Sequence, residues 1–146
     1  MVDFHLFLER LSLLYNKYIG LKYKNLGRDF DGVDCYGLLY LFYKNELNIE
    51  LPDFYDLGYE KEWYKNCENH ILNNIGTKWI KVDKPYKVFD GLVFFLGTKK
   101  VANHIALYIG KNKILHIYEN ITSRIDVLDY NFENNLYGIM RYHTFL

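Results

Sequence analysis

The stretch Asp34–Tyr43, DCYGLLYLFY, is the segment around which the rest of the chain is expected to fold. Asp34 is a residue type that favours the N-cap of a helix, and it follows a polar, glycine-containing loop at Lys22–Gly32. The residues after Asp34 are apolar or aromatic on every side of a helix, which is typical of a buried helix. The sequence therefore predicts a buried helix that begins at Cys35.

The segments before and after this helix differ in periodicity. Apolar residues recur at helical spacing in Phe4–Tyr18, which predicts an amphipathic helix ending near Gly20, and again in Glu60–Ile75. Helices followed by an antiparallel meander indicate an α+β fold, in which the N-terminal helices pack on the sheet. The runs expected to form strands are short, β-branched or aromatic: Leu92–Leu96, Val101–Ile109, Lys113–Tyr118 and Tyr137–His143.

Composition limits the class of protein. The chain has 146 residues, 50% hydrophobic and 25% charged, and its 18 basic and 18 acidic side chains give a formal net charge of +0. This length is expected to form one domain, residues 1–146. Nucleic-acid binding requires a surplus of basic residues to neutralise phosphates, and docking on an anionic membrane requires a similar surplus. Neither partner is expected.

Neither a membrane span nor a signal peptide is expected. No stretch approaches the ~20 consecutive apolar residues that a membrane helix requires. Charged residues such as Asp3, Glu9 and Arg10 interrupt the N-terminal apolar residues, and no basic n-region precedes them. We therefore expect a protein made without a secretory leader.

Cys35 is the first candidate for chemistry, because it opens the buried helix. Unpaired amides at a helix N-terminus favour an anion and lower the pKa of a thiol below its usual ~8.5, which creates a nucleophile. The carboxylate of Asp34 opposes this effect. Position alone favours an ordinary core cysteine. Cys67 lies on the apolar stripe of the Glu60–Ile75 helix and is expected in the core, with both cysteines as free thiols.

Two histidines decide between these alternatives. Strict alternation in Asn103–Ile109 places His104 and Ala106 on one face of a strand. If residues 110–112 form a three-residue loop, Ala106 lies opposite His116, and the histidines become diagonal neighbours on one face. A two-residue loop would place them on opposite faces.

A thiol and two imidazoles in series form the arrangement of papain-like catalysis. One ring takes the thiol proton, and the second orients the first by accepting its other N–H. Without Cys35, ordinary half-buried strand histidines would be the better interpretation. A zinc site formed by Cys35, His104 and His116 is a weaker alternative, because no closely spaced ligand pair nucleates it.

Four blocks of this sequence together resemble the NlpC-type cell-wall endopeptidases, which are papain-like cysteine peptidases. The blocks keep the family's order of Tyr, Cys, His and His, with the two histidines twelve residues apart. The resemblance runs from about Leu14 to Met140 and implies a papain-like NlpC fold. The blocks are Tyr23–Gly27 with Gly32–Leu38, Asp90–Phe95, His104–Tyr108 and Ile114–His116.

The resemblance implies hydrolysis of peptidoglycan stem peptides, typically between D-γ-glutamate and the following diamino acid. Cys35 would be the nucleophile, His104 the base and His116 the orienting third member. Tyr23 matches a tyrosine that lines the site and helps with the tetrahedral intermediate, and the Cys35 amide would be another oxyanion donor. Asp34 matches the acidic residue that receives the free amine of the substrate in some members. No metal or cofactor is implied.

Tyr36 stands where the family usually has serine, so it is expected to contact substrate in place of that serine. Tyr36 and the stretch Leu38–Phe54 resemble the corresponding residues in the branch of this family that is found in bacteriophage and prophage tails. That branch implies a virion tail component that is made in the bacterial cytoplasm, meets peptidoglycan at the bacterial cell wall and has other phage tail proteins as partners.

Two alternatives to a tail endopeptidase remain. One is a structural tail-tip or hub domain whose active site is idle or regulated. The other is a thiol acyltransferase acting on lipids, which ranks last because its cysteine normally follows its histidine, whereas Cys35 precedes both histidines.

Overall fold

The computed structural model describes residues 3, 6, 10, 13–55, 76–97, 99 and 101–146. Residues 13–16 are helical and the chain turns at Gly20, where φ is 85°, so the first helix ends as predicted. Most of that helix lies outside the described residues, as does the whole expected Glu60–Ile75 helix with Cys67. In the described ranges, no helix has the length and apolar character needed to cross a membrane.

Helix α2 spans Cys35–Glu46 and begins where the sequence predicts. Asp34 is its N-cap, with extended backbone and a side chain that accepts a hydrogen bond from the Gly37 N–H. The run Gly37–Tyr43 is buried throughout, which confirms the prediction of a buried helix.

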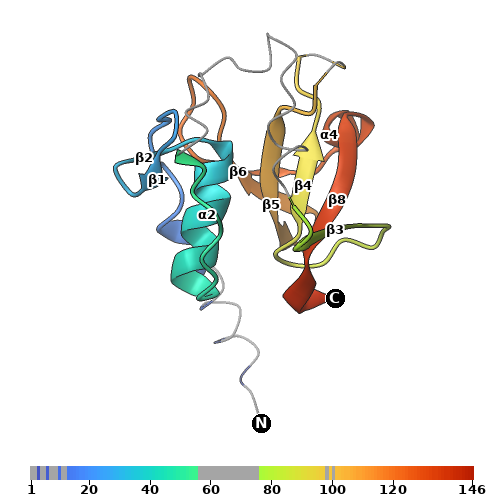
Figure 1. The fold of residues 1–146 in the computed structure, drawn as a ribbon, viewed down its shortest axis with the longest axis horizontal. Coiled ribbons are helices and arrows are strands. Elements are labelled where there is room, and N and C mark those ends of the chain that lie inside the picture. The colour runs from blue at the N-terminus through green and yellow to red at the C-terminus, as the bar shows by residue number, and fades with distance from the viewer. Residues whose placement is uncertain are drawn as a thin grey trace.

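The sheet beside this helix (Figure 1) consists of six strands. Their order is β3-β8-β4-β5-β6-β7, and each neighbouring pair is antiparallel. Its strands are β3 (Trp79–Val82), β4 (Gly91–Phe94), β5 (His104–Gly110), β6 (Lys113–His116), β7 (Arg124–Val127) and β8 (Leu136–Tyr142). A separate small hairpin, β1 (Arg28–Asp29) with β2 (Gly32–Val33), lies at the N-terminal end of α2. The α+β prediction is confirmed.

The four runs expected to form strands overlap β4, β5, β6 and β8, with ends that differ by at most three residues. The largest shift is at β5, which begins only at His104. The preceding Asn103 instead closes a loop, because its side chain both donates to and accepts from the backbone of Leu96. The sequence does not predict the two edge strands, β3 and β7, which expose much of their length to solvent.

The sheet buries a hydrophobic cluster on each face. Ile105 and Leu107 of β5 pack in the same cluster as the buried residues of α2. Ala106 and Tyr108 belong to a second cluster, against which the short helix α4 (Tyr130–Asn134) packs through a phenylalanine. The alternation predicted for β5 is therefore confirmed.

The connection between β5 and β6 differs from the expected three-residue loop. Gly110 pairs with Lys113, which leaves a two-residue turn at Lys111 and Asn112. Both turn residues have positive φ, 50° and 60°, as a type I′ hairpin requires.

A bulge next to this turn nevertheless restores the expected register. The ladder shifts between Tyr108 and Gly110, so that β5 accommodates one extra residue and Tyr108 pairs with Ile114. A regular ladder from the same turn would put His104 and His116 on opposite faces. Because of the bulge, both histidines share one face.

Candidate active site

Cys35 is the first residue of α2, and its thiol lies where the helix meets β5. Burial, and after it the carboxylate of Asp34, raise the pKa of Cys35 to about 12. The backbone N–H groups of Ile105 and Tyr36 lower it by less. The lowered pKa expected from the helix N-terminus is therefore wrong for the free protein, in which the thiol is protonated at neutral pH.

The two histidines come together as the alternation predicts. His104 begins β5 and His116 ends β6, and they are 2% and 0% exposed. His104 Nε2 lies 2.9 Å from His116 Nδ1, within hydrogen-bonding distance. The rings meet edge to face, with centroids 5.1 Å apart.

Aromatic rings enclose this histidine pair. Phe94 lies 6.0 Å from His104 and Phe132 lies 5.5 Å from His116, measured between ring centroids. Tyr118 packs edge-on against both imidazoles, at 6.0 and 5.7 Å. Burial lowers the pKa of both histidines, well below the ordinary value for His104, so both rings are neutral at pH 7.

A carboxylate that the sequence does not single out extends this row. Asp126 Oδ2 on β7 lies 2.7 Å from His116 Nε2. Arg124 donates from Nε and Nη2 to the two oxygens of Asp126, each at 2.9 Å. Partial burial raises the pKa of Asp126, but the hydrogen bonds from Arg124 and His116 outweigh it and hold that pKa below its ordinary value. The charged and apolar alternation of Arg124–Val127 is the signal that could have indicated this strand.

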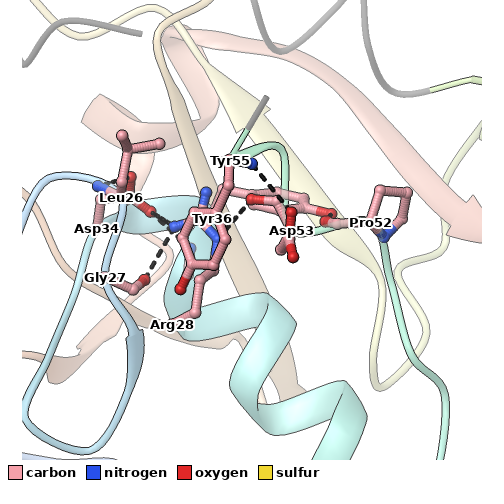
Figure 2. Close-up of polar contacts among 9 residues, drawn as sticks. Leu26, Gly27, Arg28, Asp34, Tyr36, Pro52, Asp53 and Tyr55 are labelled. Carbon is pink, nitrogen blue, oxygen red and sulfur yellow. Dashed lines mark hydrogen bonds and ion pairs between the residues drawn. The ribbon is translucent and has the colours of Figure 1, made fainter. Parts of the chain in front are cut away.

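Asp34 is buried, and Figure 2 shows its contact with Arg28. Its Oδ1 accepts from Gly37 N–H at 2.7 Å and from Arg28 Nη1 at 2.8 Å, and its Oδ2 accepts from Leu26 N–H at 3.0 Å. The side chains of Arg28 and Asp34 are 3% and 4% exposed. The carboxylate caps α2 and neutralises a buried guanidinium.

Tyr36 connects the start of α2 to residues 52–54. Its hydroxyl donates to the Pro52 carbonyl at 2.5 Å, and its ring lies 5.0 Å from that of Phe54. The Arg28 guanidinium lies 5.1 Å from the centroid of the Tyr36 ring, and both side chains are drawn in Figure 2. The Tyr36 hydroxyl is thus bonded within the protein, while the ring stays partly accessible beside Cys35.

The profile of the NlpC/P60 family matches residues 20–141, which is most of the chain. The chain belongs to the NlpC/P60 family. Its fold is shared with NlpC1 from Trichomonas vaginalis, at a TM-score of 0.64 over 92% of this chain and 43% of that one, with 20% sequence identity.

Two relatives carry names that point to different roles. Tail tip assembly protein K of Escherichia phage lambda is 36% identical over 103 residues, covering 67% of this chain and 49% of that protein. The probable endopeptidase NlpC homolog of Haemophilus influenzae is 26% identical over 106 residues, covering 73% of this chain and 46% of that protein. The chain spans about half the length of these relatives.

Tyr23 lies near the start of α2 in this NlpC/P60 domain. An isolated parallel bridge joins its backbone to Val33, two residues before Cys35. Its side chain is half-buried. Tyr23 therefore lies on the segment that pairs with the chain leading into Cys35.

The candidate site therefore consists of two groups of residues that meet at β5. Cys35 and its chain neighbours Asp34 and Tyr36 form the helix side, and the histidine row forms the sheet side. Within the described ranges no hydrogen bond joins the thiol to His104. The sulfur instead lies beside the N–H of Ile105, which belongs to the peptide bond that follows His104.

The zinc alternative is not supported by this geometry. Over the part of the chain that the structure describes, no group of three or more His, Cys, Asp or Glu side chains could hold a metal ion. His104 Nε2 and His116 Nδ1 also face each other at 2.9 Å, so neither of these nitrogens is directed at a shared metal.

Proposed function

We propose that this NlpC/P60 domain is a cysteine endopeptidase that hydrolyses peptidoglycan stem peptides. The observation that carries the proposal is the thiol at the start of α2 beside the backbone of β5, next to a hydrogen-bonded pair of neutral histidines. A thiol, a base and a group that orients the base are the components of papain-like catalysis. Membership in the family supports the assignment.

Catalysis starts from neutral partners. His104 Nδ1 takes the Cys35 proton as the sulfur attacks the scissile carbonyl carbon, and a tetrahedral oxyanion forms. The Cys35 amide and Tyr23 are proposed to stabilise this oxyanion. The imidazolium of His104 then protonates the leaving amine, which departs and leaves a thioester on Cys35. Water, deprotonated by His104, hydrolyses the thioester and restores the thiol.

Activation of the thiol is assigned to the complex with substrate. In sites without substrate, catalytic hydrogen bonds are often long and shorten only when substrate binds. A stem peptide that covers Cys35 would bring a carbonyl to the sulfur at the same time as His104 accepts its proton. Proton transfer coupled to attack does not require a preformed thiolate.

The proposed scissile bond joins D-γ-glutamate to the following diamino acid. The ring of Tyr36 is proposed to line the substrate groove in place of the usual serine. Asp34 is assigned a positioning role, since its oxygens already bind Arg28, Leu26 and Gly37.

The similarity to tail tip assembly protein K supports a place in a phage or prophage tail. There the domain would act on the cell wall in contact with other tail proteins. The same similarity favours the second candidate, a structural tail-tip domain in which the site is idle.

The experiment is mass spectrometry of muropeptides incubated with the wild type, Cys35→Ala and Cys67→Ala. We expect the wild type and Cys67→Ala to release the same fragments, and Cys35→Ala to be slower by at least about 10³-fold, because the nucleophile is missing. The masses of the fragments identify the bond. Equal cleavage by Cys35→Ala would contradict the proposal.

A particle-assembly assay separates the two candidates. If the domain is purely structural, phage particles that carry Cys35→Ala assemble and infect normally. If cleavage is required, the particles assemble but infect poorly.

A further inference from the structure

We propose that Asp126 is a positioning residue of this site: its hydrogen bond to His116 Nε2 sets the tautomers of both histidines and leaves the Nδ1 lone pair of His104 for the thiol proton. The residue acts through His116 and does not touch the reacting atoms. The role of Asp126 in catalysis rests on the proposed function, whereas the histidine tautomers are a property of the folded protein alone.

The argument begins at the edge strand β7. Arg124 binds both oxygens of Asp126, each at 2.9 Å, and Asp126 is partly exposed. These contacts keep Asp126 ionised at neutral pH, in agreement with its lowered pKa. An ionised carboxylate can only accept hydrogen bonds. At 2.7 Å, therefore, His116 Nε2 must carry the proton.

The next step follows from the chemistry of imidazole. A neutral imidazole has one N–H and one lone pair, so His116 with a proton on Nε2 has an acceptor at Nδ1. His104 Nε2 lies 2.9 Å from that acceptor and must donate to it. The lone pair of His104 is then on Nδ1, which is the form that a general base requires.

The opposite pair of tautomers is disfavoured by the negative charge of Asp126. If His116 carried its proton on Nδ1, the lone pair of its Nε2 would face the Asp126 carboxylate at 2.7 Å, with no proton between two acceptors. His104 would then accept at Nε2 and carry its proton on Nδ1, and it could not deprotonate Cys35. A doubly protonated His116 is disfavoured because its ring is 0% exposed and burial lowers its pKa.

The same row stabilises the charge that appears during catalysis. When His104 takes the thiol proton, its imidazolium is buried among Phe94, Tyr118 and His116. Asp126 lies on the far side of His116 in this hydrogen-bonded row, and its negative charge balances the positive charge of the His104 imidazolium. Loss of this charge should therefore lower kcat more than it changes KM.

The direct test is the tautomeric state of each histidine, read from long-range proton–nitrogen NMR spectra of the imidazole rings. In the wild type at pH 7, we expect His104 and His116 both to be protonated on Nε2 only. In Asp126→Ala, the Nε2–H preference of His116 should be lost, and both tautomers should be populated. A wild-type His116 protonated on Nδ1, or unchanged tautomers in Asp126→Ala, would overturn the inference.

The kinetic test uses stem-peptide cleavage. We expect Asp126→Ala to lower kcat by roughly 10- to 100-fold with little change in KM, the loss typical when the partner that orients a metal-bound histidine is removed. Asp126→Asn should recover part of the loss, because its amide oxygen can still accept from Nε2. Asp31→Asn, which removes an exposed carboxylate in the β1–β2 turn, is the control and should match the wild type. An unchanged kcat in Asp126→Ala would contradict the inference.

The two proposals fail in different ways. If neither the wild type nor any variant cleaves stem peptides, the proposed function fails. The NMR spectra then still decide whether Asp126 sets the tautomers of the two histidines. If the wild type cleaves and Asp126→Ala cleaves equally well, the function stands and the inference about Asp126 fails.

Discussion

At the scale of single residues, the pKa of Cys35 is set by opposing effects, of which burial is the largest. The helix N-terminus and the amides of Ile105 and Tyr36 favour a thiolate, whereas desolvation and Asp34 favour the thiol. Desolvation dominates and raises the pKa to about 12. The free protein therefore carries a protonated thiol at neutral pH.

Alkylation of Cys35 by iodoacetamide measures this state. We expect the rate in the free protein to rise continuously through pH 9, and at pH 8 to be roughly 10²- to 10³-fold below that of an exposed cysteine peptide, because only the thiolate reacts. The Cys35→Ala variant supplies the background from Cys67. A plateau between pH 5 and 7 would instead reveal a preformed thiolate–imidazolium pair and contradict the expectation.

At the scale of elements, the position of Cys35 depends on how closely α2 approaches the β1–β2 hairpin. Gly37 lies in the first turn of α2 against the backbone of Gly27, and a Cβ there would overlap the Gly27 carbonyl oxygen. The same contact includes Arg28 and the Asp34 carboxylate. Glycine at this position allows the cap, the buried ion pair and the thiol to share one small region.

Gly37→Ala tests this close approach. Alanine favours a helix by about 1 kcal/mol relative to glycine, but forcing atoms into a packed region costs typically about 1–3 kcal/mol and occasionally more. Because the clash is with backbone, we expect a net loss of at least about 1 kcal/mol in the free energy of unfolding, measured by urea denaturation. Lys44→Ala, on the exposed part of α2, should change it by less than about 0.5 kcal/mol. Higher stability of Gly37→Ala would refute the packing argument.

At the scale of the whole molecule, the histidine row couples folding to pH. Burial holds the pKa of His104 and His116 below the ordinary value of 6.5, so the unfolded chain binds protons first as the pH falls. Their contribution to stability is complete above pH 6.5 and declines below it. Asp126 has a lowered pKa, and its contribution is lost only in a more acidic range, as the pH falls below about 4.

We expect the free energy of unfolding to fall between pH 7 and pH 5, by at most about 1.4 kcal/mol per pH unit for each buried histidine. Urea denaturation at several pH values measures the slope. His104→Gln should flatten it, whereas His143→Gln, at an exposed position, should leave it unchanged. A stability that is constant from pH 7 to pH 5 would show that the histidines are not held neutral by the fold.

The features that the sequence predicts correctly are those with a local physical cause. The N-cap at Asp34 and the apolar run after it indicate α2, and alternation along β5 and β6 brings His104 and His116 together once the register is set. The edge strands escape prediction because each is only four residues long and much of it is exposed, so that the alternation of charged and apolar residues in Arg124–Val127 is too short to stand out.

The sequence by itself therefore determined the α+β class, the helix that carries Cys35, the histidine pair and the resemblance that the family match confirms. Only the tertiary structure decided that a bulge restores the β5–β6 register, that Asp126 on β7 hydrogen-bonds His116, and that Asp34 forms a buried ion pair with Arg28. Periodicity and capping act over a few residues and are readable along the chain. Register between distant strands, pairing of buried charges and desolvation of the thiol depend on which segments fold against one another.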